Sequence, residues 1–271
     1  MSHGRWQGEW SEVPATAARF GDIPKPLHIF RRTSVQMKLM VLCPITSTDF
    51  KKVTAQQARL IARRDTEVEV VSIEKGPVSI ESTYESATAE PYAIEKIREA
   101  EMRGFDAVAI SCMCDCGLNG GRELVKIPVT SACESSILLA SALGAKFSMI
   151  TISGGIKDLL LRLVRQAGLE SRLASIRGVD IHVVDLNRDT EKTKRALLEQ
   201  GREALERDGA QVIVLACTGM TGMAHYLQNQ LRVPVIDPLG ASIKMAETMV
   251  DLRLAQSKLA YPEPSNRVIA R

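Results

Sequence analysis

Two segments of this chain, about 105 residues apart, follow the same pattern. Residues 107–111 form an apolar run that stops at Cys112, and residues 212–216 form one that stops at Cys217. Small, polar or glycine residues follow each cysteine. Short apolar runs of this kind are typical of buried strands in a parallel sheet, and ligands usually bind where such strands end. The pattern therefore predicts that both cysteines lie at the carboxyl ends of equivalent strands.

Apolar β-branched runs alternate with helix-forming segments from Met37 onward. Such alternation predicts parallel sheets flanked by helices. The expected strands are 37–43, 68–73, 107–111, 127–129, 147–152, 180–184, 212–216 and 233–236. The expected helices are 91–103, 121–125, 134–143, 156–167, 191–208, 222–230 and 241–255.

The units around the two cysteines form a weak internal repeat. Each cysteine is followed by a short helical segment and then by an apolar segment with a central proline, at 127–129 and 233–235. The repeat predicts an α/β fold of two pseudo-twofold-related lobes, each a mostly parallel sheet flanked by helices, with the active site in the cleft between them. We assign residues 37–131 and 238–271 to the first lobe and residues 132–237 to the second.

The first 36 residues differ from the rest of the sequence. They mix Trp, Pro, Gly, Arg and Ser without a helical or strand period, which predicts a flexible N-terminal extension. A structured arm in an oligomer interface is the alternative. Met37 begins the first expected strand and is also a possible natural start.

Composition narrows the possible partners. The net charge of +3 is too small and dispersed to indicate nucleic-acid binding. No apolar run approaches the roughly 20 residues that span a membrane, and residues 1–36 lack the apolar core of a signal peptide. We therefore expect a cytoplasmic protein whose six cysteines are reduced thiols, with a small-molecule substrate and neither nucleic-acid nor membrane partners.

The paired cysteine segments resemble those of the aspartate/glutamate/hydantoin racemase superfamily, most closely its hydantoin and allantoin racemase branch. The similarity extends over residues 37–262, and its matching stretches are 112–118, 122–124, 128–129, 144–151, 214–220 and 233–237. The resemblance implies two α/β lobes around a central cleft and a homo-oligomer. It also implies catalysis without a cofactor by one cysteine from each lobe, here Cys112 and Cys217.

Thiol chemistry is suited to racemisation. One base removes a proton from one face of a carbon while an acid delivers another to the opposite face, and a thiolate and a thiol can exchange these tasks. A carbon acid next to a carbonyl also needs hydrogen-bond donors for the developing enolate. The substrate-binding residues that we expect are Ile45, Thr46, Ser79, Met113, Cys114, Thr218 and Gly219.

The loop after Cys112 departs from the branch, because Cys114 and Cys116 stand where hydantoin racemases typically have Gly and Pro. The Cys-x-Cys-x-Cys spacing lacks the Cys-x₂₋₄-Cys pattern and the second ligand cluster of a zinc site, so we expect no metal. Small residues in the binding loop are the simpler interpretation. A cysteine cluster at an active-site loop should nevertheless be easily oxidised.

The loop after the first strand departs as well. The branch commonly has Asn-Pro-Asn-Thr-Ser there, whereas this chain has Cys43-Pro-Ile-Thr-Ser47. Ile45 thus replaces a polar group expected to face the substrate, which makes a more apolar ligand than allantoin conceivable. Thr46 and Ser47 either bind substrate or cap the following helix.

Other functions remain open at this point. Maleate isomerases of the same superfamily use a cysteine pair to isomerise a double bond, and arylmalonate decarboxylases use one cysteine. A bilobed α/β protein can also bind a small molecule without turnover, and the cysteine cluster could serve a redox sensor. A buried cysteine is often a packing residue, but two at matching strand ends favour two-base racemase chemistry.

Overall fold

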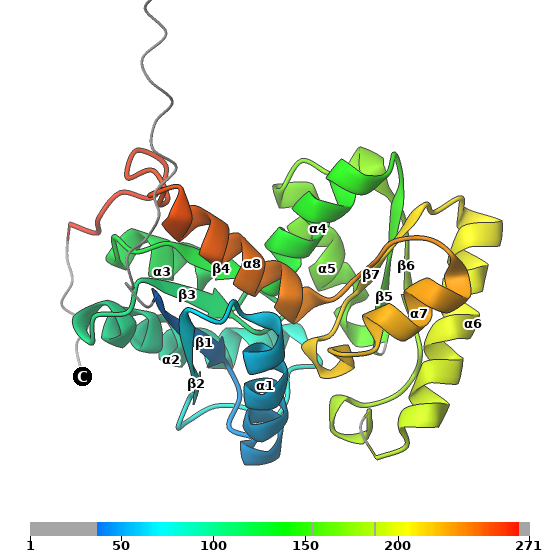
Figure 1. Ribbon diagram of the computed structural model, residues 1–271, viewed down its shortest axis with the longest axis horizontal. Coiled ribbons are helices and arrows are strands. Elements are labelled where there is room, and N and C mark those ends of the chain that lie inside the picture. The colour runs from blue at the N-terminus through cyan, green and yellow to red at the C-terminus, as the bar shows by residue number, and fades with distance from the viewer. Residues whose placement is uncertain (1–36, 153, 187, 266–271) are drawn as a thin grey trace, which may run out of the picture. The chain divides into compact units, whose positions relative to one another are not determined.

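The computed structural model describes residues 37–152, 154–186 and 188–265 (Figure 1). The predictions made for residues 1–36 lie outside these residues. The assigned lobe boundaries stay predictions, although the described residues do form two separate sheets.

Each sheet has four strands, and every strand pair is parallel. The first sheet has the order β2-β1-β3-β4 and the second the order β6-β5-β7-β8, so the same strand order occurs twice. The first four strands are β1 (Met37–Cys43), β2 (Thr66–Ser72), β3 (Ala107–Ile110) and β4 (Val129–Ser131). The second four are β5 (Phe147–Thr151), β6 (Leu173–Gly178), β7 (Val212–Leu215) and β8 (Val235–Ile236). The predicted α/β class with two parallel sheets is confirmed.

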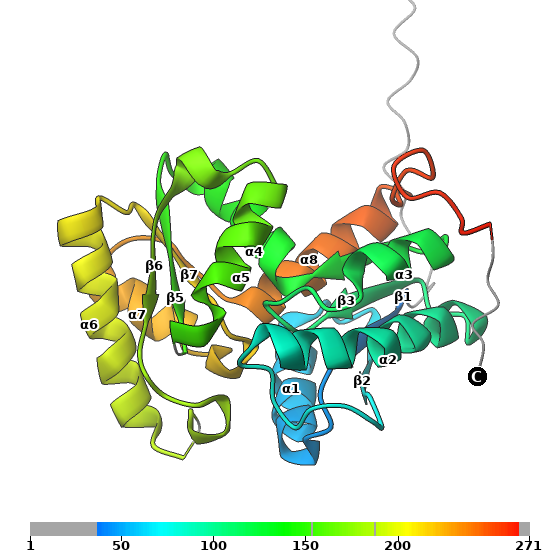
Figure 2. The same cartoon turned by 180° about the vertical axis from the view of Figure 1, so that it is seen from behind.

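Helices cover both faces of each sheet (Figures 1 and 2). They are α1 (Thr48–Ile61), α2 (Thr83–Met102), α3 (Leu118–Leu124), α4 (Ala132–Leu143), α5 (Lys157–Gln166), α6 (Thr190–Asp208), α7 (Ala224–Leu231) and α8 (Pro238–Asp251). Short 3₁₀ turns occur at Gly154–Ile156, Glu170–Arg172, Val183–Asp185 and Thr218–Met220. On the first sheet, α1 and α8 lie on one face and α2 and α3 on the other; on the second, α4 and α5 lie opposite α6 and α7.

The central strands form the cores of both sheets. Every residue of β3, β5 and β7 is buried, which explains why their sequences are continuous apolar runs. The last helix, α8, follows the second sheet in the chain but packs against β3 and β4 of the first sheet and against α4.

One predicted strand is wrong. Residues 180–184 are not a strand, because Asp180 has a left-handed φ of 51° and a 3₁₀ turn begins at Val183. The fourth strand of this sheet is instead β6, an edge strand whose residues are all half-buried. Its Arg177 pairs with Asp208 through an Nε–Oδ2 distance of 2.6 Å, and this polar edge concealed the strand in the sequence.

The second difference concerns α2. The predicted helix began at Pro91, where a proline is tolerated in the first turn. The observed helix begins at Thr83, after Ser82 whose hydroxyl accepts a hydrogen bond from Glu85 N at 3.2 Å. Glu85 in return accepts from Glu81 N at 2.7 Å, one residue before the cap, in a variant of the capping box that places the helix start upstream of the proline.

Candidate active site

Cys112 and Cys217 occupy equivalent positions in the two sheets. Each lies two residues beyond the end of its strand, β3 or β7. In the first sheet Ser111 N donates to Leu42 O at 2.7 Å, and in the second Ala216 N donates to Ile150 O at 2.8 Å. The backbone thus delivers both cysteines past the carboxyl end of the sheet in the same way.

The hydrogen bonds that the two thiols accept are matched too. Cys112 Sγ accepts from Cys114 N at 3.4 Å, and Cys217 Sγ accepts from Gly219 N at 3.4 Å. In both loops the donor is the amide two residues further along the chain. An amide that points at sulfur stabilises its thiolate form.

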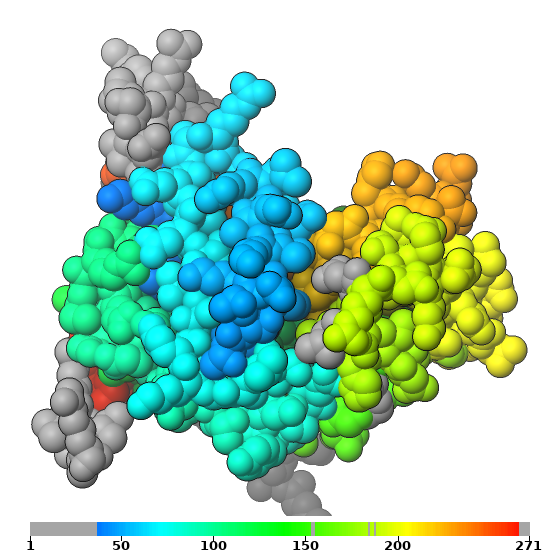
Figure 3. Space-filling view, turned by 90° about the horizontal axis from the view of Figure 1, so that it is seen from below, coloured from blue at the N-terminus to red at the C-terminus, as the bar shows by residue number. Residues whose placement is uncertain are grey.

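Both cysteines line one pocket with a cavity volume of about 40 Å³. Of the predicted binding residues, the pocket walls contain Ile45, Met113, Cys114 and Thr218. Apolar side chains from helix α1, from 3₁₀ turns and from connecting segments complete them: Phe50, Ile80, Ile152, Ile156 and Val183. Figure 3 shows the side of the molecule where the cyan segment that leads into α2 lies beside the yellow-green segment that leads into α6.

Three predicted binding residues do not line this pocket. Thr46 donates its hydroxyl to Pro77 O at 3.3 Å, and Ser79 donates its hydroxyl to Glu81 Oε1 at 3.3 Å. Gly219 acts through its amide on Cys217. Ser47 caps α1 by accepting from Phe50 N at 3.3 Å. The substrate contacts of Thr46, Ser79 and Gly219 therefore stay predictions.

A hydrogen bond joins the two cysteine loops directly. Thr218, next to Cys217, donates its hydroxyl to the carbonyl of Ser111, next to Cys112, at 3.2 Å. Their sequence separation of 107 residues shows that the contact depends on the tertiary fold alone. It fixes the position of one loop relative to the other.

The electrostatic surroundings of the two thiols differ. Burial raises the pKa of Cys217 to about 12, and its Gly219 amide only partly offsets this. Cys112 lies among Cys114 and Cys116, with 4.0 Å between the sulfurs of Cys112 and Cys116. Hydrogen bonds within this trio and burial raise the pKa of Cys112 well above its ordinary value. The same hydrogen bonds lower the pKa of Cys116, because its neighbours donate to its thiolate.

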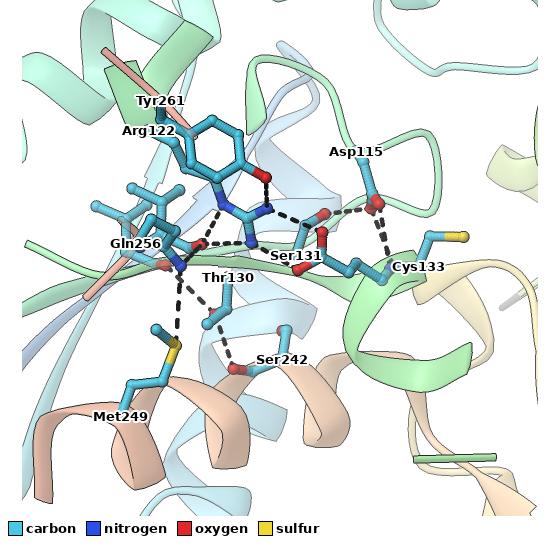
Figure 4. A network of polar contacts seen from close by, with 12 residues as sticks. Asp115, Arg122, Thr130, Ser131, Cys133, Ser242, Met249, Gln256 and Tyr261 are labelled. Atoms are coloured by element: carbon cyan, nitrogen blue, oxygen red, sulfur yellow. Dashed lines mark hydrogen bonds and ion pairs between the residues drawn. The ribbon is translucent and has the colours of Figure 1, made fainter. Parts of the chain in front are cut away.

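Asp115 anchors the Cys112 loop (Figure 4). Its carboxylate accepts from the hydroxyl of Ser131 and from the amides of Cys133 at 3.0 Å and Glu134 at 3.1 Å, at the start of α4. Burial raises the pKa of Asp115 to about 7. Its φ of 52° and the φ of 79° at Gly117 turn the chain back on itself. A Cβ at Gly117 would lie 3.1 Å from Ala93 Cβ, so a side chain there would be crowded as well as strained.

Arg122 forms a second group of hydrogen bonds in the same region. Its guanidinium donates to Val129 O at 3.0 Å and 3.1 Å, to Glu134 at 2.6 Å and 2.9 Å, and to the hydroxyl of Tyr261 at 3.1 Å (Figure 4). Arg122 is buried and does not line the cysteine pocket. It therefore acts as a structural tie between α3, β4 and the C-terminal segment.

Sequence reasoning missed a contact at the pocket wall. Glu81 binds His182 through an Oε2–Nδ1 distance of 2.8 Å and accepts from Val183 N at 3.1 Å. Its neighbour Ile80 and Val183 itself both line the pocket. Glu81 raises the pKa of His182 through this hydrogen bond and its charge. No sequence pattern could reveal the pair, because 101 residues separate its members.

Neither a metal site nor a membrane-spanning helix occurs among the described residues. No group of three or more His, Cys, Asp or Glu side chains in the described ranges is placed to hold a metal ion. No helix within them combines the length and the apolar character that crossing a membrane requires. The cytoplasmic location and the homo-oligomer stay predictions.

Comparisons with known proteins agree with this architecture. The structure superposes on allantoin racemase from Klebsiella pneumoniae with a TM-score of 0.83 at 30% identity, covering 87% of this chain and 96% of that one. The hydantoin racemase of Pseudomonas sp. (strain NS671) is 41% identical over 235 residues, 86% of this chain and 94% of that protein. The hydantoin racemase of Paenarthrobacter aurescens is 34% identical over 233 residues, 85% and 99% of the two chains.

The fold and these relatives define an isomerase of the racemase class. Residues 39–246 match the sequence model described as Asp/Glu/Hydantoin racemase, which spans both cysteine loops. The chain belongs to the Asp/Glu/hydantoin racemase family.

Proposed function

We propose that this protein racemises 5-substituted hydantoins by proton transfer between Cys112 and Cys217. The observation that carries the proposal is the matched placement of the two thiols. They follow equivalent strand ends and line the same pocket, and each sulfur accepts a hydrogen bond from the amide two residues further along the chain. Similarity to hydantoin racemases supports the substrate class.

The proposed reaction moves one proton at a time. The thiolate of one cysteine takes the proton from C5, and the C–H electron pair shifts to the adjacent carbonyl as an enolate. The thiol of the other cysteine then delivers its proton to the opposite face of C5 and becomes the thiolate. Thr218 lines the pocket, and its backbone N–H is the proposed donor for the enolate oxygen, because the one proton of its hydroxyl is donated to Ser111 O.

The raised pKa values of both thiols have a chemical use in this scheme. A thiolate with a high pKa is a stronger base toward a weakly acidic C–H bond, although a smaller fraction of the protein carries it at neutral pH. The two amides that point at the sulfurs partly offset that loss. The enzyme would therefore work faster as the pH rises above neutrality.

The pocket walls favour a neutral, apolar-substituted ring. None of the described residues that line the pocket carries a charged side chain, and most are apolar. A free amino acid or maleate would bring charged groups into this pocket without a partner, which is costly. Ile45 lines the pocket with hydrocarbon, which offers no hydrogen bond to the polar ureido group of allantoin. We therefore expect alkyl- and arylalkyl-hydantoins to be better substrates than allantoin.

Proton NMR in D₂O tests the proposal. Purified protein with reduced thiols is mixed with single enantiomers of 5-benzylhydantoin, 5-isopropylhydantoin and allantoin, and the C5–H signal is followed together with optical rotation. We expect both to decay with the wild-type protein and racemisation to be lost in C112S and C217S. C43A is the matched control, because Cys43 also ends a strand but lies outside the pocket. A racemisation rate equal to that of the wild-type protein in either serine variant would contradict the mechanism.

The substrate preference has a test of its own. Ile45→Asn supplies a polar group at the pocket wall, and we expect it to raise the ratio of kcat/KM for allantoin to that for 5-benzylhydantoin by about tenfold, the value of one well-placed hydrogen bond. An unchanged ratio would show that Ile45 does not face the substituent.

A further inference from the structure

The proposed reaction uses Cys112 but leaves its neighbour Cys116 without a role. Cys116 is only 2% exposed and does not line the pocket, whereas Cys112 is 9% exposed and does. Their sulfurs are 4.0 Å apart. The loop thus places a buried second thiol directly behind a thiol that small molecules in the pocket can reach.

The backbone keeps these two thiols together. Asp115 N donates to Cys112 O at 3.3 Å, and Leu118 N donates to Asp115 O at 3.1 Å, within the turn made by the left-handed Asp115 and Gly117. The bonds from the Asp115 carboxylate to the start of α4 hold this turn in place. The turn therefore holds the two sulfurs within reach of each other.

We propose that Cys112 and Cys116 form a reversible disulfide when a hydroperoxide enters the pocket, with Cys116 as the resolving cysteine. The disulfide blocks the thiol on which turnover depends and is reopened by a dithiol. The predicted loss of activity rests on the proposed function. The disulfide itself does not.

The chemistry is balanced with hydrogen peroxide as the oxidant. The Cys112 thiol first loses its proton; the thiolate attacks one peroxide oxygen, so that an S–O bond forms and the O–O bond breaks, and the hydroxide that leaves is converted to water by the proton that Cys112 released. Cys116 then attacks the sulfenic sulfur of Cys112; the S–S bond forms, the S–O bond breaks, and the departing hydroxide takes the Cys116 proton. Two thiols and one peroxide give one disulfide and two water molecules, with sulfur oxidised and peroxide oxygen reduced.

Cys116 is better suited than Cys114 to be the resolving nucleophile. The Cys116 sulfur lies 3.3 Å from the hydroxyl of Ser86, which can stabilise a thiolate by donating to it. The pKa of Cys116 is lowered by its neighbours, whereas the pKa of Cys114 is raised well above its ordinary value. When Cys116 is a thiolate, it can also take the proton of Cys112 across their contact, so that Cys112 becomes the thiolate that attacks peroxide.

Mass spectrometry of the full-length wild-type protein tests the disulfide independently of any activity. The protein is treated with an equimolar amount of hydrogen peroxide, alkylated with N-ethylmaleimide and digested with trypsin. The peptide spanning residues 104–122 contains all three thiols. We expect it to lack two hydrogens, to resist fragmentation between residues 112 and 116, and to carry one maleimide label on Cys114. A bridge that involves Cys114, three labelled thiols, or a stable sulfinic acid on Cys112 would overturn the proposal.

Activity recovery provides the second measurement, with each protein compared to its own untreated rate. After peroxide and then dithiothreitol, wild type should regain most of its racemisation rate, about 80% or more. C116S should regain less than about 20%, because an unresolved sulfenic acid is oxidised irreversibly. C114S is the matched control and should recover like wild type. Equal recovery in C116S and wild type would refute the role of Cys116. If the protein racemises no hydantoin, the mass readout alone decides.

Discussion

The loop after β3 and the loop after β7 deliver a cysteine in the same way and then surround it differently. In the first, two further thiols and the anchored Asp115 enclose Cys112. In the second, Cys217 begins a short 3₁₀ turn and its only sulfur contact among the described hydrogen bonds is the Gly219 amide. The backbone that the two sheets share determines the position of each thiol. The side chains around it, which differ between the two loops, determine its pKa and its reactivity. Mutagenesis, thiol labelling and pH-dependent unfolding can separate these two contributions.

Replacing one cysteine at a time should give two variants that act on opposite enantiomers of the substrate. C112S and C217S should each lose at least about a thousandfold in racemisation rate, because one of the two proton-transfer groups is gone. Each should still exchange C5–H for deuterium in one enantiomer, and the two variants should prefer opposite enantiomers, because the remaining thiol faces one side of the ring. NMR with separate enantiomers in D₂O measures this. The same preference in both variants would mean that the thiols do not flank the carbon.

The two loops should differ in thiol reactivity in the ligand-free protein. The pKa of Cys217 is raised to about 12, so its thiolate should be scarce at pH 7.5. In the first loop the pKa of Cys112 is raised as well, but the pKa of Cys116 is lowered, so the cysteine trio holds a thiolate at pH 7.5. We expect iodoacetamide to label the peptide with residues 104–122 at least about a hundredfold faster than the peptide with residues 208–232, because labelling follows the thiolate fraction. Equal rates would show that the cysteine trio holds no reactive thiolate.

Asp115 should give the first loop a pH-dependent stability that the second lacks. Its folded pKa of about 7 lies above the unfolded value near 3.9, so the folded protein keeps a proton that the unfolded chain has lost between these values. Stability from this group is therefore present below about pH 4 and is lost as the pH rises to about 7. After allowance for its partial exposure, we expect a fall of about 2 kcal/mol in the free energy of unfolding.

Urea denaturation of wild type and D115N across this pH range measures the effect. The difference in free energy between the two proteins should shrink as the pH rises from about 4 to about 7, and contributions from other groups cancel. Asp189 caps the exposed start of α6, and D189N is the control, with an expected loss of about 1 kcal/mol or less. A difference that is constant with pH would contradict the raised pKa of Asp115.

The contact between Glu81 and His182 should have the smallest effect. Glu81 raises the pKa of His182, so their ion pair is complete below about pH 6.5 and is lost as the pH rises through that raised value. His182→Ala should raise KM about threefold at pH 6 and leave it unchanged at pH 9, because Ile80 and Val183 are then less firmly held against the substrate. R165A, which removes a surface pair with Glu170, is the control and should change neither value. A shift at both pH values would point to a structural role.

The sequence predicted well those features that depend on neighbouring residues. The buried strands β3 and β7 are continuous apolar runs, so both cysteine positions followed from the pattern. The edge strand β6 did not, because its half-buried residues alternate between apolar packing and polar pairs such as Arg177 with Asp208. A strand that is buried on both faces is a continuous apolar run and is easy to recognise in a sequence. A half-buried edge strand has a mixed pattern and is not.

The direction of side chains in the loops was the other feature that the sequence did not predict. Thr46 and Ser79 were predicted to face the substrate, yet their hydroxyls bind Pro77 O and Glu81. Asp115 gave no sign that it would cap α4, because its partners belong to a strand and a helix further along the chain. Such hydrogen bonds form only once the sheets are in place, and no local spacing predicts them.

The path of the chain has a mechanical consequence. The backbone leaves the first sheet once, after Ser131, and returns once, through Ile236 into α8, which packs on β3 and β4. Two bodies joined by two covalent connections can rotate readily about the line through both, while twisting about other axes strains one connection or the other. A pocket of about 40 Å³ is far smaller than the roughly 150 Å³ cavity that accepts benzene. Entry of a hydantoin would therefore need the pocket walls to separate, which breaks the Thr218–Ser111 hydrogen bond, and rotation about that line is the motion that the two connections permit most easily.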